Sequence, residues 1–250
     1  MSRADVALVE RGFFASRAKA REAIEAGLVT LDGRPVAKPS EPVPEQARLD
    51  ARPAYPWVSR GGVKLAAALD AFAFDPGGKQ ALDIGASTGG FSDVLLTRGV
   101  AHITCVDVGH GQLHPRIARD SRVKSLERRD ARTLSAADLP APPQLIVGDV
   151  SFISLEKILP PVLALAAPRA EAVFLIKPQF EVGPGLVKKG FVRDEAAQKA
   201  ACERIASLFP KLGWKVIGVI LSPIEGGDGN REFLIGARHS VFERNGNHFA

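Results

Sequence analysis

From about residue 61 onward, short apolar runs alternate with longer segments in which apolar residues recur every three or four positions. Runs of four to eight apolar residues are typical of buried strands, and the wider spacing is typical of helices that bury one face. The predicted strands are 80–84, 102–108, 122–126, 144–150, 172–176, 214–221 and 231–237. The predicted helices are 64–72, 89–99, 154–166 and 194–213. Strands separated by helices predict a doubly wound α/β fold, with a parallel sheet covered on both faces.

The last two predicted strands are joined by a loop alone, "SPIEGGDGN". A parallel connection needs a crossover of a dozen residues or more, so we expect this pair to be antiparallel. A mainly parallel sheet that ends in an antiparallel pair resembles the Rossmann-like methyltransferases.

Residues 1–52 follow a different pattern. "ADVALVERGF" and "SRAKAREAIEAG" have helical spacing, and Ser16 is suited to cap the second helix. Asp32 and Gly33 suit a two-residue hairpin turn, because both central positions of that turn need positive φ. These elements predict a small α+β domain over 1–52, a proline-rich linker over 53–60, and the α/β domain over 61–250.

Composition narrows the class of protein. The 250 residues are 46% apolar, which is enough for a core, and the net charge of +5 is compatible with a nucleic-acid partner. No apolar run reaches the roughly 18 residues of a membrane span, and charges interrupt the first residues where a signal peptide would be apolar. We therefore expect a cytoplasmic protein with two reduced cysteines, no metal and no membrane partner; a monomer is favoured.

The turn "ALDIGASTGGF" follows the first predicted strand of the α/β domain, where ligands bind in such sheets. Its glycines do not match the G-x-G-x-x-G pattern of dinucleotide sites. Asp83 would repel a pyrophosphate, whereas it would attract S-adenosylmethionine, which has an ammonium, a sulfonium and no phosphate. The turn therefore predicts S-adenosylmethionine as the cofactor.

Two further carboxylates follow the next strands. Asp107 is placed to accept both ribose hydroxyls of the cofactor. Asp130 could accept from the adenine amino group, or it could be a solvated acid among neighbouring arginines. The predicted cofactor-binding residues are Asp83, Gly85, Ser87, Thr88, Gly89, Gly90, Phe91, Asp107 and Asp130.

Four charged residues stand where the predicted strands and helices begin or end: Lys64, Asp149, Lys177 and Glu232. The last three fall on the ligand-binding edge of the sheet, and a lone charge at a buried strand end is costly unless it has a function.

Five motifs, "RGGVKL", "DIGASTGGF", "GDVSFISL", "IKPQFE" and "GNREFLI", resemble the TlyA (hemolysin A) family of ribosomal RNA 2′-O-methyltransferases, in the FtsJ-like group. The resemblance implies that Lys64, Asp149, Lys177 and Glu232 are a catalytic tetrad. It also implies methyl transfer from S-adenosylmethionine to a ribose 2′-hydroxyl, in cytidines of ribosomal RNA within ribosomal subunits.

The amino-terminal pattern "ADVALVERGFFASRAKAREAIEAGLVTLDGRPV" resembles the small αL RNA-binding domain first described in a ribosomal protein. The alternative for its basic residues is a solvated surface. A second basic group follows the "KPQFE" motif. The predicted RNA-binding residues are Arg3, Arg11, Arg17, Lys19, Arg21, Lys188, Lys189 and Arg193.

Lys177 is the candidate that deprotonates or orients the 2′-hydroxyl. A free lysine has a pKa of about 10.4. Burial and Lys64 would lower the pKa of Lys177, and the two acids would raise it. The sequence therefore does not decide whether Lys177 deprotonates or orients the hydroxyl. Three alternatives also stay open: a dinucleotide-dependent oxidoreductase, a membrane-active hemolysin, and an RNA-binding protein without catalysis.

Overall fold

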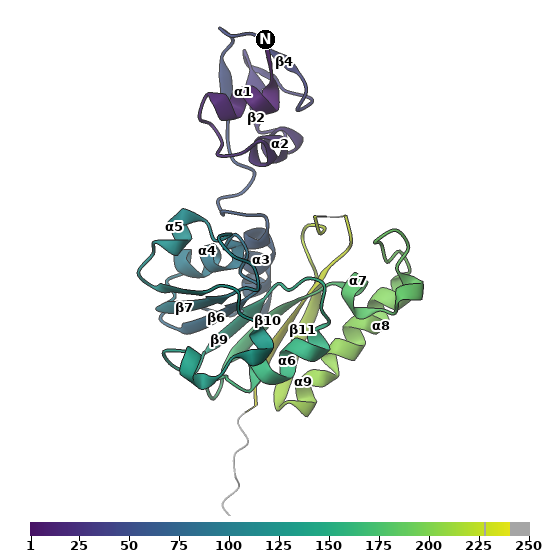
Figure 1. Cartoon of the computed structure of the whole chain (residues 1–250). Helices are drawn as coiled ribbons and strands as arrows, with labels where there is room; N and C mark the ends of the chain where they lie inside the picture. The colour runs from purple at the N-terminus through teal and green to yellow at the C-terminus, as the bar shows by residue number, and fades with distance from the viewer. Residues whose placement is uncertain (228, 241–250) are drawn as a thin grey trace, which may run out of the picture. The chain divides into compact units, whose positions relative to one another are not determined.

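A computed structural model describes residues 1–227 and 229–240 of the chain. It forms two compact units, Met1–Pro56 and Trp57–Ala250 (Figure 1). The division falls inside the predicted linker. Trp57 packs against the second unit, where a Cβ on Gly62 would lie 2.3 Å from its indole ring, so the second half of that segment is part of the larger unit.

The first unit contains two packed helices and two small sheets, of order β1-β4 and β3-β2-β5. Its elements are β1 (Ser2–Arg3), α1 (Ala4–Glu10), α2 (Arg17–Glu25), β2 (Val29–Leu31), β3 (Arg34–Pro35), β4 (Pro42–Val43) and β5 (Leu49–Ala51). As predicted, the Ser16 hydroxyl caps α2, where it accepts from the backbone N–H of Lys19. The turn between β2 and β3 has positive φ at Asp32 and Gly33, the geometry that the hairpin prediction required.

The segment after this hairpin contributes two strands to the first unit. β4 pairs with β1 and β5 pairs with β2, both antiparallel. Val43 and Leu49 from these strands are buried in the core of the small unit with Leu8 and Ile24. The segment therefore completes the first unit.

The second unit is the predicted doubly wound sheet, with strand order β11-β12-β10-β9-β6-β7-β8. β12 runs antiparallel to β10 and β11, and the other neighbours are parallel, as expected. The larger elements are α3 (Gly61–Phe72), β6 (Gln80–Ile84), α4 (Gly90–Thr97), β7 (His102–Val106), α5 (Pro115–Ala118), β8 (Val123–Leu126), β9 (Leu145–Gly148), α6 (Leu155–Leu163), β10 (Glu171–Ile176), α7 (Pro178–Glu181), α8 (Glu195–Ala206), α9 (Leu208–Lys211), β11 (Trp214–Leu221) and β12 (Phe233–His239). Three 3-10 turns complete the unit: η1 (Ala131–Thr133), η2 (Ala136–Asp138) and η3 (Pro184–Leu186).

Helices cover both faces of this sheet (Figure 1). α3, α4 and α5 bury one face around Leu65, Val94 and Ile117. α6, α8 and α9 bury the other, around Leu159 and Phe209. The predicted helix 194–213 is divided into α8 and α9 near Ser207. Pro210 explains the break, because it has no N–H to donate to the carbonyl of Ala206.

Strand register places the ends of five strands at one edge of the sheet. Ile84, the last residue of β6, pairs with Val106 of β7 and with Gly148 of β9. Ile176, which ends β10, pairs with Phe233, which begins β12. The residues just beyond these positions therefore share one edge, and they include most of the predicted site.

Candidate active site

A cavity of about 450 Å³ opens at this edge, beyond the ends of β6, β7 and β9. Five of the residues singled out in the sequence line it: Gly85, Ser87, Asp107, Asp130 and Asp149. Much of the remaining wall is formed by apolar side chains, among them Val108, Ile153 and Ile158.

Position 85 requires a glycine, because the backbone there lies very close to the backbone of Asp149. The φ of Gly85 is +76°, and a Cβ there would lie 2.4 Å from the carbonyl oxygen of Asp149. A side chain at this position would push the turn after β6 away from the end of β9, and so would distort the wall of the cavity.

Asp107 is fixed by two backbone donors. Its Oδ2 accepts from the N–H of Ser87 at 2.8 Å, and its Oδ1 accepts from the N–H of Gly109 at 2.7 Å. Each carboxylate oxygen has a further lone pair. The group is therefore held at the cavity wall in a fixed orientation and can still accept from two neighbouring hydroxyls.

Asp83 is placed differently from our expectation of a carboxylate that faces the ligand. It is fully buried behind the turn, and its Oδ2 accepts from the hydroxyl of Ser92 at 2.6 Å. Its Oδ1 is buried with no hydrogen-bond partner among the described residues. Burial, with the negative charges of Asp149 and Asp107 as lesser causes, raises the pKa of Asp83 to about 7.

The other residues of the turn pack it against the rest of the unit. A Cβ on Gly90 would lie 2.1 Å from the Ser59 hydroxyl, and one on Gly89 would lie 2.9 Å from Leu113. Phe91 is buried in the core, whereas Thr88 is exposed. A direct ligand contact of Thr88, Gly89, Gly90 or Phe91 stays a prediction.

Asp130 lines the cavity, but it already has a partner. Arg132 forms an ion pair with it at 2.6 Å, and this pairing holds the pKa of Asp130 below its usual value. Its carboxylate also accepts from the Arg132 N–H at the start of η1. The adenine contact of Asp130 stays a prediction, and the neighbouring arginine that the sequence pointed to is in direct contact.

The predicted tetrad is assembled from four separate parts of the fold. Lys64 of α3 contacts Glu232 through Nζ and Oε2 at 2.5 Å, and both side chains are buried. Lys177, just after β10, forms an ion pair with Asp149, in which Nζ lies 2.6 Å from Oδ1. Lys177 also donates to the Ser151 hydroxyl at 2.8 Å.

The two ion pairs influence one another. Burial raises the pKa of Glu232, the charges of Lys64 and Lys177 lower it, and the charge of Asp149 raises it again; the balance is above the usual value. The four charges therefore form one electrostatic unit.

A second cavity of about 390 Å³ lies beside the tetrad. Lys177 and Glu232 line it, whereas Asp149 lines the first cavity. Ser151 and Phe152 line both. The Lys177–Asp149 pair therefore lies where the two cavities meet, so a group bound in one can reach a group bound in the other.

Phe152 was not predicted from the sequence as a site residue. Its side chain is 91% exposed, its φ is +63°, and its ring centroid lies 5.1 Å from that of Phe180. An exposed aromatic residue in a strained backbone conformation is a feature of functional sites. The sequence feature that could have indicated Phe152 is an aromatic residue in the polar segment directly after a strand, "GDVSF".

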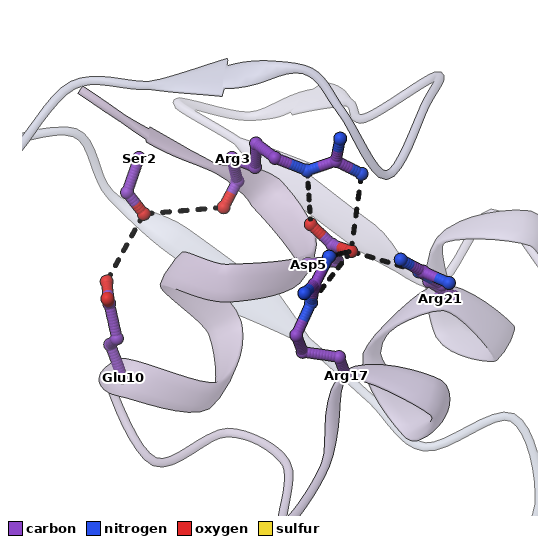
Figure 2. A network of polar contacts seen from close by, with 6 residues as sticks. All are labelled: Ser2, Arg3, Asp5, Glu10, Arg17 and Arg21. Carbon is purple, nitrogen blue, oxygen red and sulfur yellow. Dashed lines mark hydrogen bonds and ion pairs between the residues drawn. The ribbon is translucent and has the colours of Figure 1, made fainter.

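Three of the predicted RNA-binding residues meet in the first unit, as Figure 2 shows. Arg3, Arg17 and Arg21 all bind the buried carboxylate of Asp5, at 3.0, 2.9 and 2.9 Å. Burial alone would raise the pKa of Asp5, but the hydrogen bonds from the three arginines outweigh it and hold the pKa well below its usual value. We call these three residues the arginine cluster; about half of each side chain is exposed.

Arg11 and Lys19 have local contacts instead. Arg11 donates to the backbone carbonyls of Pro44, Glu45 and Ala47 and so anchors the segment between β4 and β5. Lys19 lies over the ring of Tyr55, 4.3 Å from its centroid. RNA contacts of these two residues stay predictions.

Lys188, Lys189 and Arg193 are exposed, on a short hairpin whose residues Val187 and Gly190 line the second cavity. The predicted basic group after the "KPQFE" motif thus lies at the rim of the site.

Comparison with known proteins decides the family. The family model of FtsJ-like methyltransferases matches residues 57–239, and that of the S4 domain matches residues 2–49. The chain belongs to the FtsJ-like methyltransferase family. Because the match covers all four tetrad positions, the cluster around Lys177 lies in the methyltransferase unit, and the arginine cluster lies in the S4 domain.

Relatives match this chain across both of its units. The chain is 44% identical to the 16S/23S rRNA (cytidine-2′-O)-methyltransferase TlyA of Mycobacterium tuberculosis, over 95% of this chain and 90% of the relative. It is 36% identical to Hemolysin A of Brachyspira hyodysenteriae, over 93% and 98%. A solved structure of a candidate hemolysin from Streptococcus thermophilus is similar, with a TM-score of 0.76 and 36% identity over 96% of this chain and 89% of that chain.

Among the residues that the structure describes, no helix of this FtsJ-like methyltransferase is long and apolar enough to cross a membrane.

Proposed function

We propose that this chain transfers the methyl group of S-adenosylmethionine to the 2′-hydroxyl of a cytidine ribose in ribosomal RNA, and that it works in the cytoplasm. The observation that carries the proposal is the Lys64–Asp149–Lys177–Glu232 cluster at the junction of two cavities. Relatives that share most of the chain carry the name of that activity.

The first cavity suits S-adenosylmethionine. Asp107 can accept the two ribose hydroxyls, and the apolar wall around Val108 and Ile153 can cover the adenine. Arg129 and Arg132 also line the cavity, but each is paired with an acid, Asp138 and Asp130, so neither offers an unpaired cation to a phosphate. This donor set fits a cofactor without phosphate. When bound, S-adenosylmethionine supplies an electrophilic methyl group on a sulfonium.

The second cavity suits the ribose that accepts the methyl group. Lys177 lines it and is held by Asp149 and Ser151. A lysine in an ion pair with a carboxylate donates hydrogen bonds, so Lys177 binds and orients the 2′-hydroxyl oxygen and stabilises the negative charge that develops on it. The bond from this oxygen to the methyl carbon forms as the bond from that carbon to sulfur breaks, and the hydroxyl proton is released to solvent. Of the two roles that the sequence left open, the ion pair supports orientation. Glu232, which is held by its ion pair with Lys64, also lines this cavity.

Phe152 and Phe180 offer a surface for the target base. A base that is turned out of an RNA stack can be held by stacking on an exposed aromatic ring. Phe152 lies beside both Lys177 and the first cavity, so a base stacked there would bring its own ribose to the junction.

The arginine cluster of the S4 domain can add RNA affinity to that of the methyltransferase unit. Three guanidinium groups around one carboxylate keep a net positive charge, and they are half-exposed. Guanidinium groups bind phosphates with defined geometry. We infer that this cluster contacts the RNA backbone.

Replacement of Lys177 tests the proposed chemistry. We expect Lys177→Ala to lower methyl transfer to ribosomal RNA at least about 100-fold while the Kd for S-adenosylmethionine stays the same, because the substitution removes a contact made to the acceptor oxygen. Lys211→Ala, an exposed lysine on α9, is the matched control and keeps full activity. Near-normal turnover by Lys177→Ala would contradict the assigned role.

A further inference from the structure

The segment 187–193, which we call the basic hairpin, has a defined structure. Lys188 and Phe191 exchange two backbone hydrogen bonds, of 2.9 and 3.0 Å. Lys189 and Gly190 at the tip both have positive φ, 51° and 84°. A lysine in the left-handed conformation costs free energy, so other contacts must maintain this turn.

The side chain of Asn230 supplies those contacts. It is 3% exposed; its Nδ2 donates to the carbonyl of Gly190 at 2.8 Å, and its Oδ1 accepts from the N–H of Val192 at 3.2 Å. The carbonyl of Val192 in turn accepts from the buried side chain of Gln198 at 2.6 Å. One amide therefore holds both sides of the hairpin tip.

Asn230 also belongs to the catalytic edge of the sheet. It precedes Glu232 by two residues, in the segment that leads into β12. The basic hairpin is thus tied to the same segment that carries a member of the tetrad. Gly190, whose carbonyl Asn230 holds, lines the second cavity together with Lys177 and Glu232.

The lysines of the basic hairpin differ from several arginines of this unit, which are held by carboxylates. Arg116, Arg122, Arg204 and Arg231 are each paired with an acid. Within the described part of the chain, Lys188 and Lys189 form no ion pair, and both are exposed. Unpaired lysines at the rim of a cavity that accepts a nucleotide are available to phosphates.

We propose that Asn230 is a positioning residue for the RNA: it fixes the basic hairpin so that Lys188 and Lys189 bind backbone phosphates next to the ribose that is methylated. The inference rests on the proposed function. Only an amide offers one donor and one acceptor in this geometry, so aspartate, which has the same shape, would set an acceptor against the Gly190 carbonyl.

The test compares Asn230→Asp, the pair Lys188→Ala/Lys189→Ala, and all three changes together, in the full chain. For Asn230→Asp we expect the KM for ribosomal RNA to rise about tenfold, with kcat within about threefold and the Kd for S-adenosylmethionine unchanged, because phosphate contacts act in RNA binding. The lysine pair should show the same pattern. The matched control is Lys211→Ala/Lys215→Ala, which removes the same charge from exposed positions of α9 and β11.

The salt dependence of RNA binding, and the additivity of the substitutions, distinguish a positioning role of Asn230 from a general loss of structure. The slope of log K for RNA binding against log salt should fall by about 1 to 2 in Asn230→Asp and in the lysine pair alike. Asn230→Asp should add little once both lysines are absent. Full additivity, an unchanged RNA KM in either variant, or a loss confined to kcat would overturn the inference.

The failure of this inference is distinguishable from that of the proposed function. No methyl transfer by the unchanged chain would contradict the proposed function, and RNA binding would still report on Asn230 through the salt slope. Normal transfer with unaltered RNA binding in Asn230→Asp would contradict the inference alone.

Discussion

The proposed role of Phe152 separates function from stability of the fold. Because its side chain is 91% exposed, we expect Phe152→Ala to change the free energy of unfolding by no more than about 0.5 kcal/mol. Stacking on one base is worth about 1–3 kcal/mol, so kcat/KM for RNA should fall about 5- to 150-fold. Phe152→Trp should restore activity. Methylation kinetics with both variants check this, and an unchanged kcat/KM in Phe152→Ala would remove the stacking role.

Asp83 makes a prediction about pH. Its raised pKa means that folding favours the protonated form, so this group stabilises the fold at low pH, and that contribution is lost as pH rises from about 4 toward its folded pKa of about 7. Asp83→Asn keeps an acceptor for the Ser92 hydroxyl and cannot ionise. The free energy of unfolding of Asp83→Asn minus that of the unchanged chain should therefore rise by about 2–3 kcal/mol between pH 5 and pH 7.

Urea titrations of both proteins at the two pH values measure that difference. A difference that stays constant with pH would mean that Asp83 is ionised throughout and that its burial does not penalise the charge.

At the scale of elements, most of the α/β unit followed from the pattern of apolar residues. Each predicted strand is present. The central strands β6, β9 and β10 are apolar runs buried between two layers of helices, whereas β8 and β11 at the edges of the sheet are partly exposed. The short helices α5 and α7 were not predicted, since one turn of helix leaves no periodicity to detect. The burial of Asp83 could have been foreseen: when both faces of a sheet are covered, no position in a central strand is exposed.

The arginine cluster was only half predictable. The sequence showed Arg17 and Arg21 four apart on one helix, but it could not show that Asp5 of another helix binds both. Such convergence depends on how α1 packs against α2, which no local pattern encodes. In the same way, the motifs predicted the four members of the tetrad, while their division into two ion pairs came from the structure.

The arginine cluster predicts that replacement of Asp5 weakens RNA binding, although it removes a negative charge. Asp5→Asn removes a negative charge, so long-range attraction alone would strengthen RNA binding. If Asp5 instead holds the three guanidinium groups in place, binding weakens. We expect weaker binding, together with a loss of about 1–3 kcal/mol of stability in residues 1–56. Glu25→Gln, an exposed position on α2, makes the same charge change and is the control.

The contribution of Asp5 to the stability of residues 1–56 depends on pH. The pKa of Asp5 is lowered in the folded chain, so its contribution is present above the unfolded pKa of about 4 and is lost as pH falls below that value. Hydrogen exchange of residues 1–56 at neutral pH and near pH 2 measures it. Equal exchange in Asp5→Asn and the unchanged chain at neutral pH would show that the cluster does not stabilise the S4 domain.

For the whole molecule, we expect the second unit to bind the cofactor and carry out the chemistry, and the first unit to contribute to RNA binding. The first cavity and the tetrad are built from residues of the second unit. Deletion of residues 1–52 should therefore leave the Kd for S-adenosylmethionine unchanged and weaken methylation of ribosomal RNA. Isothermal titration and methyl-transfer assays check the two halves of this prediction, and full activity without the S4 domain would contradict it.

The central claim is that the Lys177 site places a methyl group on the 2′-oxygen of a cytidine in ribosomal RNA. Mapping of ribose methylation on unmodified ribosomal RNA, incubated with S-adenosylmethionine and either the unchanged chain or Lys177→Ala, tests it most directly. We predict a new 2′-O-methylcytidine with the unchanged chain, and none with Lys177→Ala. A methyl group on a base, or the same 2′-O-methylation from both proteins, would contradict the account.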